Sequence, residues 1–394
     1  MCKRLFLIWH VNARNCDAPP LENLCNALPS AESLESNCEY NALDEEIHIA
    51  IVANERYMFY LFVTALSVLA STKKENLTFH FFTENVTQDS FLRVKSELQR
   101  FRPCNVLQHT CNMSEIEALG VGGWGGVKGT KNVWIRTFFC ELLPEVHWLV
   151  YLDCDILYLK PIETFLEQRD EKVSVVAVKD GNEWTRRTET DWVHKRIPRI
   201  SLSEERYFNA GVLLLNLDYL RNCGFAEKVR RFTQEVGVPP SLDQTTLNAL
   251  LCDGVKLVDE SFNCSQQRAY HYIQEGGQVV IHYCSGTPWS RTPSIPLNQR
   301  LMLWHLFVDA AYWHKPGQSL GMTFCLPIRI WKLALRVILS HPLLRYICSP
   351  LLNPIFHYRG ETRLRGLYDN WIRNDLHWQK PLQWLLPTSV RCNE

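Results

Sequence analysis

The stretch WLVYLDCDILYLKP, residues 148–161, places two carboxylates inside a run that otherwise has the composition of a buried strand. Desolvating an unpaired carboxylate is costly, so buried carboxylates normally face a cation or another charge. Side chains two residues apart point to the same face of an extended chain. Asp153 and Asp155 are therefore expected to face one divalent ion together, whereas Cys154 points away into the packing.

The ligand chemistry of this pair favours a hard cation, because carboxylate oxygens suit Mn²⁺ or Mg²⁺. An isolated Asp-x-Asp is more often a cap of the following turn or a partner of Arg or Lys. The rest of the chain must therefore decide between a metal site and a structural pair.

The composition is typical of a folded globular protein with one large domain and an appendage, since 46% of the 394 residues are hydrophobic and 21% are charged. Lys plus Arg and Asp plus Glu number 42 each, so the net charge gives no argument for nucleic-acid binding. The 15 Cys are scattered without a Cys-x-x-Cys pair, which favours a reducing compartment over a disulfide framework or a zinc ribbon.

The residue patterns divide the chain into three regions. Residues 1–45 are rich in Asn, Cys, Glu, Ser and Pro and predict a poorly ordered extension, residues 46–290 predict the main domain, and residues 291–394 differ in character. The first residues make a poor signal peptide, and no uncharged stretch reaches the roughly 18 residues that span a bilayer. The protein is expected to stay in the cytoplasm, where it is made.

Short strand patterns and helix patterns alternate from residue 47 onward, which predicts a mostly parallel sheet covered by helices. Strands are expected at residues 47–53, 77–83, 106–109, 148–161, 173–179, 207–217 and 279–282, and helices at 57–71, 90–101, 132–143 and from 242. A glycine-rich loop is expected at residues 119–130. Ligands of such sheets bind at the carboxyl ends of the strands.

Neither phosphate-binding glycine motif is present in the chain. The glycines of residues 119–130 are not closed by Gly-Lys-Ser/Thr, and no Gly-x-Gly-x-x-Gly follows the first strand. A ligand with phosphates would therefore need neutralisation by a metal and by Arg or Lys.

Three polar residues downstream each have a functional and a plain interpretation. Asn209 stands in the strand at 207–217 either for close approach to a ligand or as a turn residue. Asp243 lies at a helix start, where capping is the simpler reason for it. His282 ends an apolar strand and is either a third metal ligand or a satisfied edge residue.

The combined set resembles glycosyltransferase family 8, with bacterial lipopolysaccharide glucosyl- and galactosyltransferases as the nearest likeness, over about residues 47–290. The motifs that carry the resemblance are YLDCDI at 151–156, YFNAGV at 207–212, Asp243-Gln244, and His282 followed by Gly286 and Pro288-Trp289. The resemblance implies a GT-A catalytic domain, UDP-glucose or UDP-galactose as donor, Mn²⁺ with Mg²⁺ as the alternative, and hexosyl transfer with retention to a saccharide acceptor such as lipopolysaccharide core.

The resemblance also implies roles for single residues. Asp153, Asp155 and His282 would ligate the metal that bridges the donor diphosphate. The implied donor-binding residues are Asn54 and Glu55 at the uridine and ribose, Arg136 at the donor sugar or phosphate, and Cys154 and Gly286. The implied reacting face consists of Asp180, which hydrogen-bonds the donor sugar, with Asn209, Asp243, and Gln244 at the position of the family's nucleophile or oxocarbenium stabiliser.

One motif departs from the family pattern His-x-x-Gly-x-x-Lys-Pro-Trp, because the segment from His282 to Trp289 is one residue shorter and lacks the Lys. Arg136 or Arg291 could supply the missing cation, although Arg and Lys differ in geometry. The missing Lys favours a non-catalytic sugar-nucleotide-binding relative as the alternative. A metal-dependent nucleotide-sugar hydrolase or phosphotransferase also remains open.

The C-terminal region is basic and rich in Trp. Residues 327–394 hold ten Arg plus Lys and four Asp plus Glu, and residues 328–340 can form a helix with Arg329, Lys332 and Arg336 on one side. This pattern predicts peripheral attachment to an anionic membrane surface, where a lipid-linked acceptor would be presented. A helical cap packed on the catalytic domain is the alternative.

Overall fold

The computed structural model describes residues 46–111, 113–122, 131–266, 268–269, 272 and 277–284. The predictions for residues 1–45, the glycine-rich segment 123–130, Gly286 and residues 291–394 lie outside the described residues. The described residues include most of the predicted main domain.

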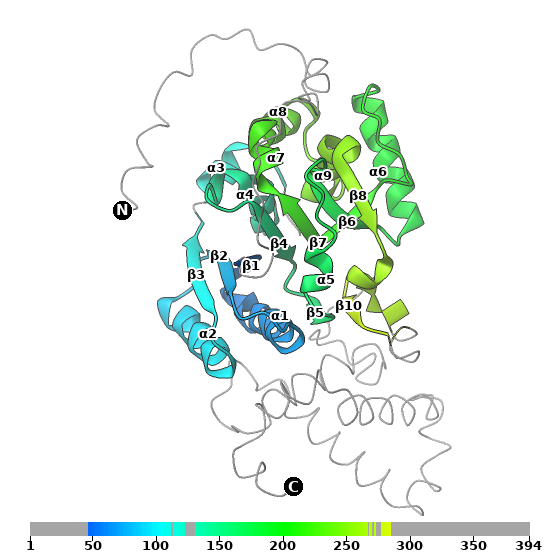
Figure 1. Ribbon diagram of the computed structural model, residues 1–394. Helices are drawn as coiled ribbons and strands as arrows, with labels where there is room; N and C mark the ends of the chain where they lie inside the picture. Colours follow the sequence, from blue (N-terminus) through cyan, green and yellow to red (C-terminus); the bar gives the residue numbers. More distant parts are fainter. Residues whose placement is uncertain are drawn as a thin grey trace, which may run out of the picture.

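A seven-stranded sheet forms the centre of the domain in the order β3-β2-β1-β4-β7-β6-β8 (Figure 1). Every neighbouring pair is parallel except the two pairs that contain β7. The strands are β1 (Ile47–Asn54), β2 (Leu77–Glu84), β3 (Asn105–Thr110), β4 (Trp148–Leu152), β6 (Val175–Lys179), β7 (Phe208–Asn216) and β8 (Val255–Val258). The predicted mostly parallel sheet is therefore confirmed.

Helices cover both faces of this sheet (Figure 1). One core cluster joins the sheet to α1 (Met58–Ser71) and α2 (Gln88–Phe101), and another joins it to helices on the opposite face. The second group consists of η5 (Asn132–Phe138), α4 (Phe139–Leu142), α7 (Leu217–Asn222), α8 (Phe225–Val236) and α9 (Leu242–Leu251). The remaining helices of the described residues are α3 (Ser114–Ala118), α5 (Glu163–Leu166), α6 (Glu183–Arg196), η4 (Glu55–Tyr57), η6 (Cys252–Gly254) and η7 (Glu260–Phe262).

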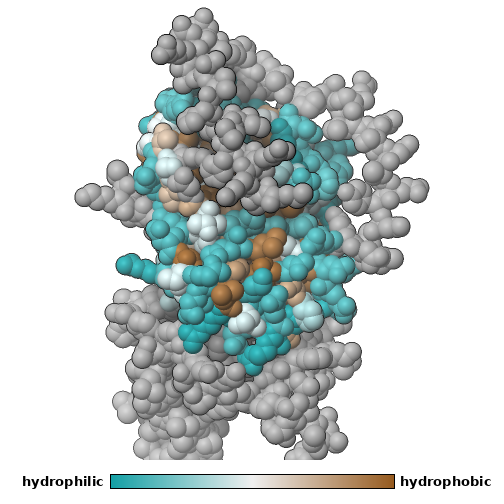
Figure 2. Space-filling view, turned by 90° about the vertical axis from the view of Figure 1, so that its left-hand side faces the viewer, coloured by the Kyte–Doolittle hydropathy of each residue, from teal (hydrophilic) through white to brown (hydrophobic). Residues whose placement is uncertain are grey.

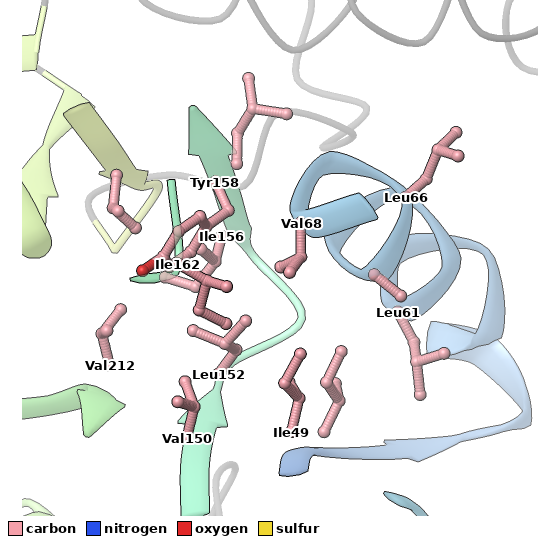
Figure 3. Close-up of a cluster of buried hydrophobic side chains, with 14 of the residues drawn as sticks. Ile49, Leu61, Leu66, Val68, Val150, Leu152, Ile156, Tyr158, Ile162 and Val212 are labelled. Carbon is pink, nitrogen blue, oxygen red and sulfur yellow. The ribbon is translucent and has the colours of Figure 1, made fainter. Parts of the chain in front are cut away.

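Successive side chains of β1 point to opposite faces of the sheet, so this strand contributes to the core cluster on each face. Ile49 and Ile51 belong to the cluster on the α1 face, whereas Ala50 belongs to the opposite cluster. Figure 3 shows how side chains of α1 and of the strands gather on the α1 face. Because α1 lacks charged residues and 11 of its 14 residues are buried, burial stabilises it more than its propensity does.

The Asp-x-Asp stretch does not form the single strand predicted for residues 148–161. It forms β4 of the central sheet and β5 (Ile156–Leu159) of a second sheet, with Asp153 and Asp155 in the connection between them. The second sheet has the order β5-β10-β9, with β9 (Cys264–Ser265) parallel and β5 antiparallel to the central β10 (Val279–His282). The apolar pattern indicated burial correctly, but it could not reveal that the chain changes sheets.

The helix predicted at residues 132–143 is confirmed as far as residue 142, but it is not α-helical throughout. Its first half is the 3₁₀ helix η5, and only α4 is α-helical. Val133, Ile135 and Thr137 are β-branched, which lowers the propensity for an α-helix. The η5 conformation carries Arg136, whose Nη1 donates to the carbonyl oxygen of Ala210 at 2.6 Å.

The domain surface beside β3 is mostly hydrophilic with small hydrophobic patches (Figure 2). Within the described part of the chain, no helix combines the length and the apolar character needed to cross a bilayer.

Candidate active site

Strand ends converge at one side of the sheet and position the polar residues. Asn54 ends β1, Asp153 follows β4, Asp180 follows β6, and Asn209 stands at the start of the antiparallel β7. These four residues line a cleft of about 990 Å³. The cleft therefore lies at the carboxyl ends of the parallel strands, as the sequence predicted.

Asp153, Asp155 and His282 form a cluster in the cleft, with their potential ligand atoms all within 4.8 Å of one another. The Nε2 atom of His282 lies 3.4 Å from Asp155 Oδ1 and 3.9 Å from Asp153 Oδ2. Two carboxylates and one imidazole form a donor set for a divalent ion such as Mn²⁺. His282 lies in the central strand of its sheet, so the edge-residue interpretation is wrong.

Mutual interactions pull the pKa values in this cluster apart. Burial opposes ionisation of both carboxyls, but His282 holds the pKa of Asp155 below its usual value. Burial, together with the Asp155 charge, leaves the pKa of Asp153 raised even though Arg136 opposes the change. Burial alone would lower the pKa of His282, yet the Asp155 carboxylate raises it. A divalent cation would relieve the repulsion between the carboxylates.

The ring of His282 packs against the backbone of Gly211. A Cβ at position 211 would lie 2.2 Å from Cε1 of His282, so only glycine leaves room for the ring. His282 Nδ1 also lies 3.0 Å from Asn263 Oδ1. The backbone of β7 and the side chain of Asn263 therefore hold the imidazole in place.

Arg136 is buried and contacts several acidic groups at once. Its Nη1 lies 3.2 Å from Asp153 Oδ1, its Nε lies 2.7 Å from Asp243 Oδ2, and its guanidinium lies 4.5 Å from the Tyr151 ring centroid. Burial disfavours its charge, but Asp153 and Asp243 outweigh this and raise the pKa of Arg136 above its usual value. Arg136 lines the cleft, where its single positive charge offsets part of the negative charge of the two aspartates.

Asp243 lies in the first turn of α9, two residues after the N-cap residue Ser241. Simple capping is not its main feature, because its side chain is buried and paired with Arg136. Burial raises the pKa of Asp243 to about 6, with Arg136 opposing the shift. Burial and the charge of Arg136 therefore together set the pKa of a carboxyl that lines the cleft.

Asp180, Asn209 and Gln244 form a second hydrogen-bonded group that lines the cleft. Asp180 Oδ2 accepts from Asn209 Nδ2 at 3.1 Å and from Gln244 Nε2 at 3.2 Å. The Oε1 atom of Gln244 accepts from the backbone N–H of Ala210 at 3.0 Å. The structure therefore brings these three predicted residues together and orients both amides.

Of the two residues predicted to contact the nucleoside, Asn54 lines the cleft and Glu55 does not. Asn54 lines the cleft, and its side chain also accepts from the N–H of Arg56 at 3.1 Å. The Glu55 carboxylate instead accepts from the N–H of Thr87 at 2.9 Å, and Glu55 is not among the residues that line the cleft. Cys154 is buried with Sγ 3.1 Å from the carbonyl oxygen of Val52, in agreement with packing, and it also borders the cleft.

Carboxylates outnumber cations among the described residues that line the cleft. The cations are Arg136, Lys179 and Arg268, and the carboxylates are Asp153, Asp155, Asp180, Glu183, Asp243 and Glu260. An anionic ligand would be repelled by this wall unless a metal ion entered with it. The excess of carboxylates therefore fits a cleft that takes up a cation.

Sequence patterns did not identify several residues of the cleft. Tyr57 and Trp184 line it with exposed side chains, and Trp184 is 65% exposed. The side chain of Asn263 is buried between His282 and Asn209. No periodicity or spacing marks such residues, because their partners lie far away in the chain.

Known proteins resemble this chain over the same domain. The sequence profile of Glycosyl transferase family 8 matches residues 48–292, which is more than half of the chain. General stress protein A of Bacillus subtilis (strain 168) is 23% identical over 278 residues, covering 64% of this chain and 91% of that protein. Lipopolysaccharide 1,3-galactosyltransferase of Salmonella typhimurium is 22% identical over 286 residues, covering 68% and 80%.

Solved structures agree with the fold. A crystal structure of the galactosyltransferase LgtC with donor and acceptor sugar analogues matches with a TM-score of 0.52 and 20% identity, covering 67% of this chain and 94% of LgtC. The GT-A architecture inferred from sequence is thus confirmed. This chain belongs to glycosyl transferase family 8 and is a glycosyltransferase enzyme.

Proposed function

We propose that this protein is a retaining, metal-dependent hexosyltransferase that moves glucose or galactose from a UDP-sugar to a saccharide acceptor. The observation that carries the proposal is the Asp153–Asp155–His282 cluster, which lines the same cleft as the Asp180–Asn209–Gln244 group. A diphosphate and a sugar are covalently joined, so a donor needs a metal site and a sugar site side by side. The names of several relatives, a galactosyltransferase and a glucosyltransferase among them, support a hexose donor.

Asp153, Asp155 and His282 would hold Mn²⁺ or Mg²⁺, because two carboxylates and an imidazole suit such ions. When bound, the ion would act as a Lewis acid that stabilises the charge on the departing diphosphate. Arg136 keeps Asp153 oriented through its 3.2 Å ion pair. The excess of carboxylates in the cleft makes donor binding depend on this ion.

Asp180, Asn209 and Gln244 would bind the hydroxyl groups of the donor sugar. Their side chains already hydrogen-bond one another, so little rotamer entropy is lost when the sugar binds. Asn54 and the exposed Tyr57, which line the cleft close to the end of β1, would contact the nucleoside.

Transfer breaks the bond between the anomeric carbon and a diphosphate oxygen and forms a bond from that carbon to the acceptor oxygen. The acceptor proton leaves with the diphosphate. An amide is a weak nucleophile, and Gln244 Oε1 already accepts the N–H of Ala210, which supports same-face attack over a covalent intermediate on Gln244.

The acceptor would be a saccharide such as lipopolysaccharide core, as the name of the Salmonella relative suggests. A lipid-linked acceptor fits the basic, Trp-rich residues 327–394, which we propose attach the enzyme to the inner face of the cytoplasmic membrane. Flotation of the full-length protein with phosphatidylglycerol vesicles should exceed that with phosphatidylcholine vesicles, and Arg329→Glu with Arg336→Glu should reduce it. Equal flotation in all cases would contradict membrane attachment.

Release of UDP from a panel of UDP-sugars tests the main proposal. The assay compares Mn²⁺ with EDTA, wild type with Asp155→Ala, and the presence with the absence of a lipopolysaccharide-core extract. Release that needs Mn²⁺ and the acceptor, and that disappears in the variant, would support transfer and identify the donor. Donor binding without turnover would indicate a non-catalytic relative. UDP release at the same rate with and without the acceptor would indicate a hydrolase.

A further inference from the structure

Asn263 connects the metal ligand His282 to Asn209, a member of the Asp180–Asn209–Gln244 group. Its Oδ1 lies 3.0 Å from His282 Nδ1, and its Nδ2 donates to Asn209 Oδ1 at 2.9 Å. It comes after η7 and precedes β9, and only 8% of its surface is exposed. A buried amide with both ends engaged has one preferred orientation, which has consequences for the groups it contacts.

The orientation of Asn263 follows from groups whose donors and acceptors are certain. Asn209 Oδ1 accepts from the backbone N–H of Gly211 at 3.0 Å, and Asn209 Nδ2 donates to Asp180 Oδ2. The oxygen of Asn209 therefore faces Asn263, and the group of Asn263 that meets it must be the NH₂. The oxygen of Asn263 then faces His282.

This orientation determines the tautomer of His282. Because Asn263 Oδ1 has only lone pairs to offer, Nδ1 of His282 must carry the proton. In the neutral ring, Nε2 is then unprotonated, and it is the atom that lies 3.4 Å from Asp155 Oδ1. An unprotonated Nε2 is what a metal ligand requires.

We propose that Asn263 is a positioning residue that holds His282 in the Nδ1–H tautomer and thereby presents Nε2 to the divalent ion. The role rests on the proposed metal site. A backbone N–H of β7 sets, through Asn209 and Asn263, the ring orientation of a ligand in a different sheet. The same chain of contacts links the metal ligand to Asp180 on the donor-sugar wall.

Two substitutions of Asn263 distinguish the effect of its contact with His282 from that of its contact with Asn209. Asn263→Ala removes both hydrogen bonds. Asn263→Asp keeps an acceptor for the His282 Nδ1–H, but its second oxygen faces Asn209 Oδ1, which the Gly211 N–H and Asp180 prevent from turning round. The tautomer should therefore survive in Asn263→Asp and be lost in Asn263→Ala.

The test measures Mn²⁺ affinity by electron paramagnetic resonance of the free ion, without donor or turnover. Asn263→Ala should weaken binding roughly 10–100-fold, as for other residues that orient metal ligands, whereas Asn263→Asp should stay close to wild type. Asn222→Ala, at an exposed position that ends α7, is the matched control and should bind as wild type does. Unchanged affinity in Asn263→Ala, or lost affinity in Asn263→Asp, would overturn the inference.

Nitrogen-15 NMR of the metal-free protein, labelled at histidine, gives a second measurement. At a pH above the raised pKa of His282, where the ring is neutral, the wild type and Asn263→Asp should show His282 protonated at Nδ1 and bare at Nε2, with the signal assigned by its absence in His282→Gln. Asn263→Ala should lose this preference. A neutral wild-type His282 ring that carries its proton at Nε2 and not at Nδ1 would overturn the inference even if no variant folded.

These measurements also keep the role of Asn263 separate from the proposed function. If the wild type binds no Mn²⁺, the metal-dependent transferase proposal fails, while the NMR result still tests the role of Asn263. If Mn²⁺ binds and the tautomer does not depend on Asn263, the proposed function stands and only the inference fails.

Discussion

Polar residues inside apolar runs were the most informative single residues of the sequence. Asp153, Asp155 and His282 were predicted from this pattern and from the family resemblance, and the structure gathers them in one cluster. The pairing of Arg136 with Asp243 and the contacts of Asn263 could not be predicted. Each joins residues from separate elements, and no local pattern encodes such a meeting.

Gly211 gives a prediction at the scale of one residue. In Gly211→Ala the new Cβ would overlap the His282 ring, whose Cε1 lies 2.2 Å from its position. The ring cannot keep its present position, so Mn²⁺ affinity and turnover should fall about tenfold or more, with a loss of roughly 1–3 kcal/mol in unfolding free energy.

Isothermal titration with Mn²⁺ and chemical denaturation measure the two effects. Gly181→Ala is a suitable control, because a Cβ there meets no atom within 4 Å. Its metal affinity should equal that of wild type. A Gly211→Ala variant with the Mn²⁺ affinity of wild type would show that metal binding does not require the present position of the His282 ring.

At the scale of elements, helix α1 holds the connection that bears the aspartates. The buried Thr64 hydroxyl lies 3.0 Å from the carbonyl oxygen of Cys154 and 2.8 Å from that of Ile156. Ser67 Oγ accepts from the N–H of Tyr158 at 2.8 Å. These contacts fix the chain where it leaves the central sheet for the second one. Apolar periodicity predicted α1 well, but it gave no sign of these hydroxyl contacts.

Thr64→Val should loosen this connection while keeping the volume of the side chain. Two buried carbonyls lose a donor, so the unfolding free energy should fall by about 1–3 kcal/mol and the Mn²⁺ affinity should fall as well. Thr233→Val on α8 also removes a buried hydroxyl, one that bonds only its own helix, and should leave metal binding unchanged. Equal metal affinities in the two variants would contradict the role of Thr64.

A row of histidines crosses the first three strands and predicts acid sensitivity. His80 Nε2 lies 3.0 Å from His48 Nδ1, and His80 Nδ1 lies 3.0 Å from His109 Nε2. Burial, with the charges of His109 and His48, lowers the pKa of His80 to about 3, and burial also lowers the pKa of His109. The unfolded chain therefore binds protons at these positions at a higher pH than the folded chain does.

The contribution of His80 to the unfolding free energy is fully present above about pH 6.5, the pKa of His80 in the unfolded chain. This contribution is lost as the pH falls towards 3, the pKa of His80 in the folded chain. The unfolding free energy should be about 2 kcal/mol lower at pH 5 than at pH 7 from His80 alone. Denaturation of wild type and His80→Phe across this range measures the effect. A wild-type slope no steeper than that of the variant would argue against it.

At the scale of the whole molecule, the order of elements predicted the α/β architecture and the side of the sheet that binds ligands. The family profile and the LgtC structure agree with the predicted architecture. The change of sheet after Asp155 could not be predicted, because an apolar run has the same pattern in one strand or two. It matters for function, since β5 pairs with β10 and so brings His282 to the aspartates.

The proposed metal and donor sites can be located together by anomalous scattering at the manganese edge, from crystals grown with Mn²⁺ and a non-transferable UDP-sugar analogue. We predict a peak between Asp153, Asp155 and Nε2 of His282, with the diphosphate against it and the sugar beside Asp180 and Gln244. A manganese peak elsewhere, or a donor bound outside this cleft, would contradict the proposed site.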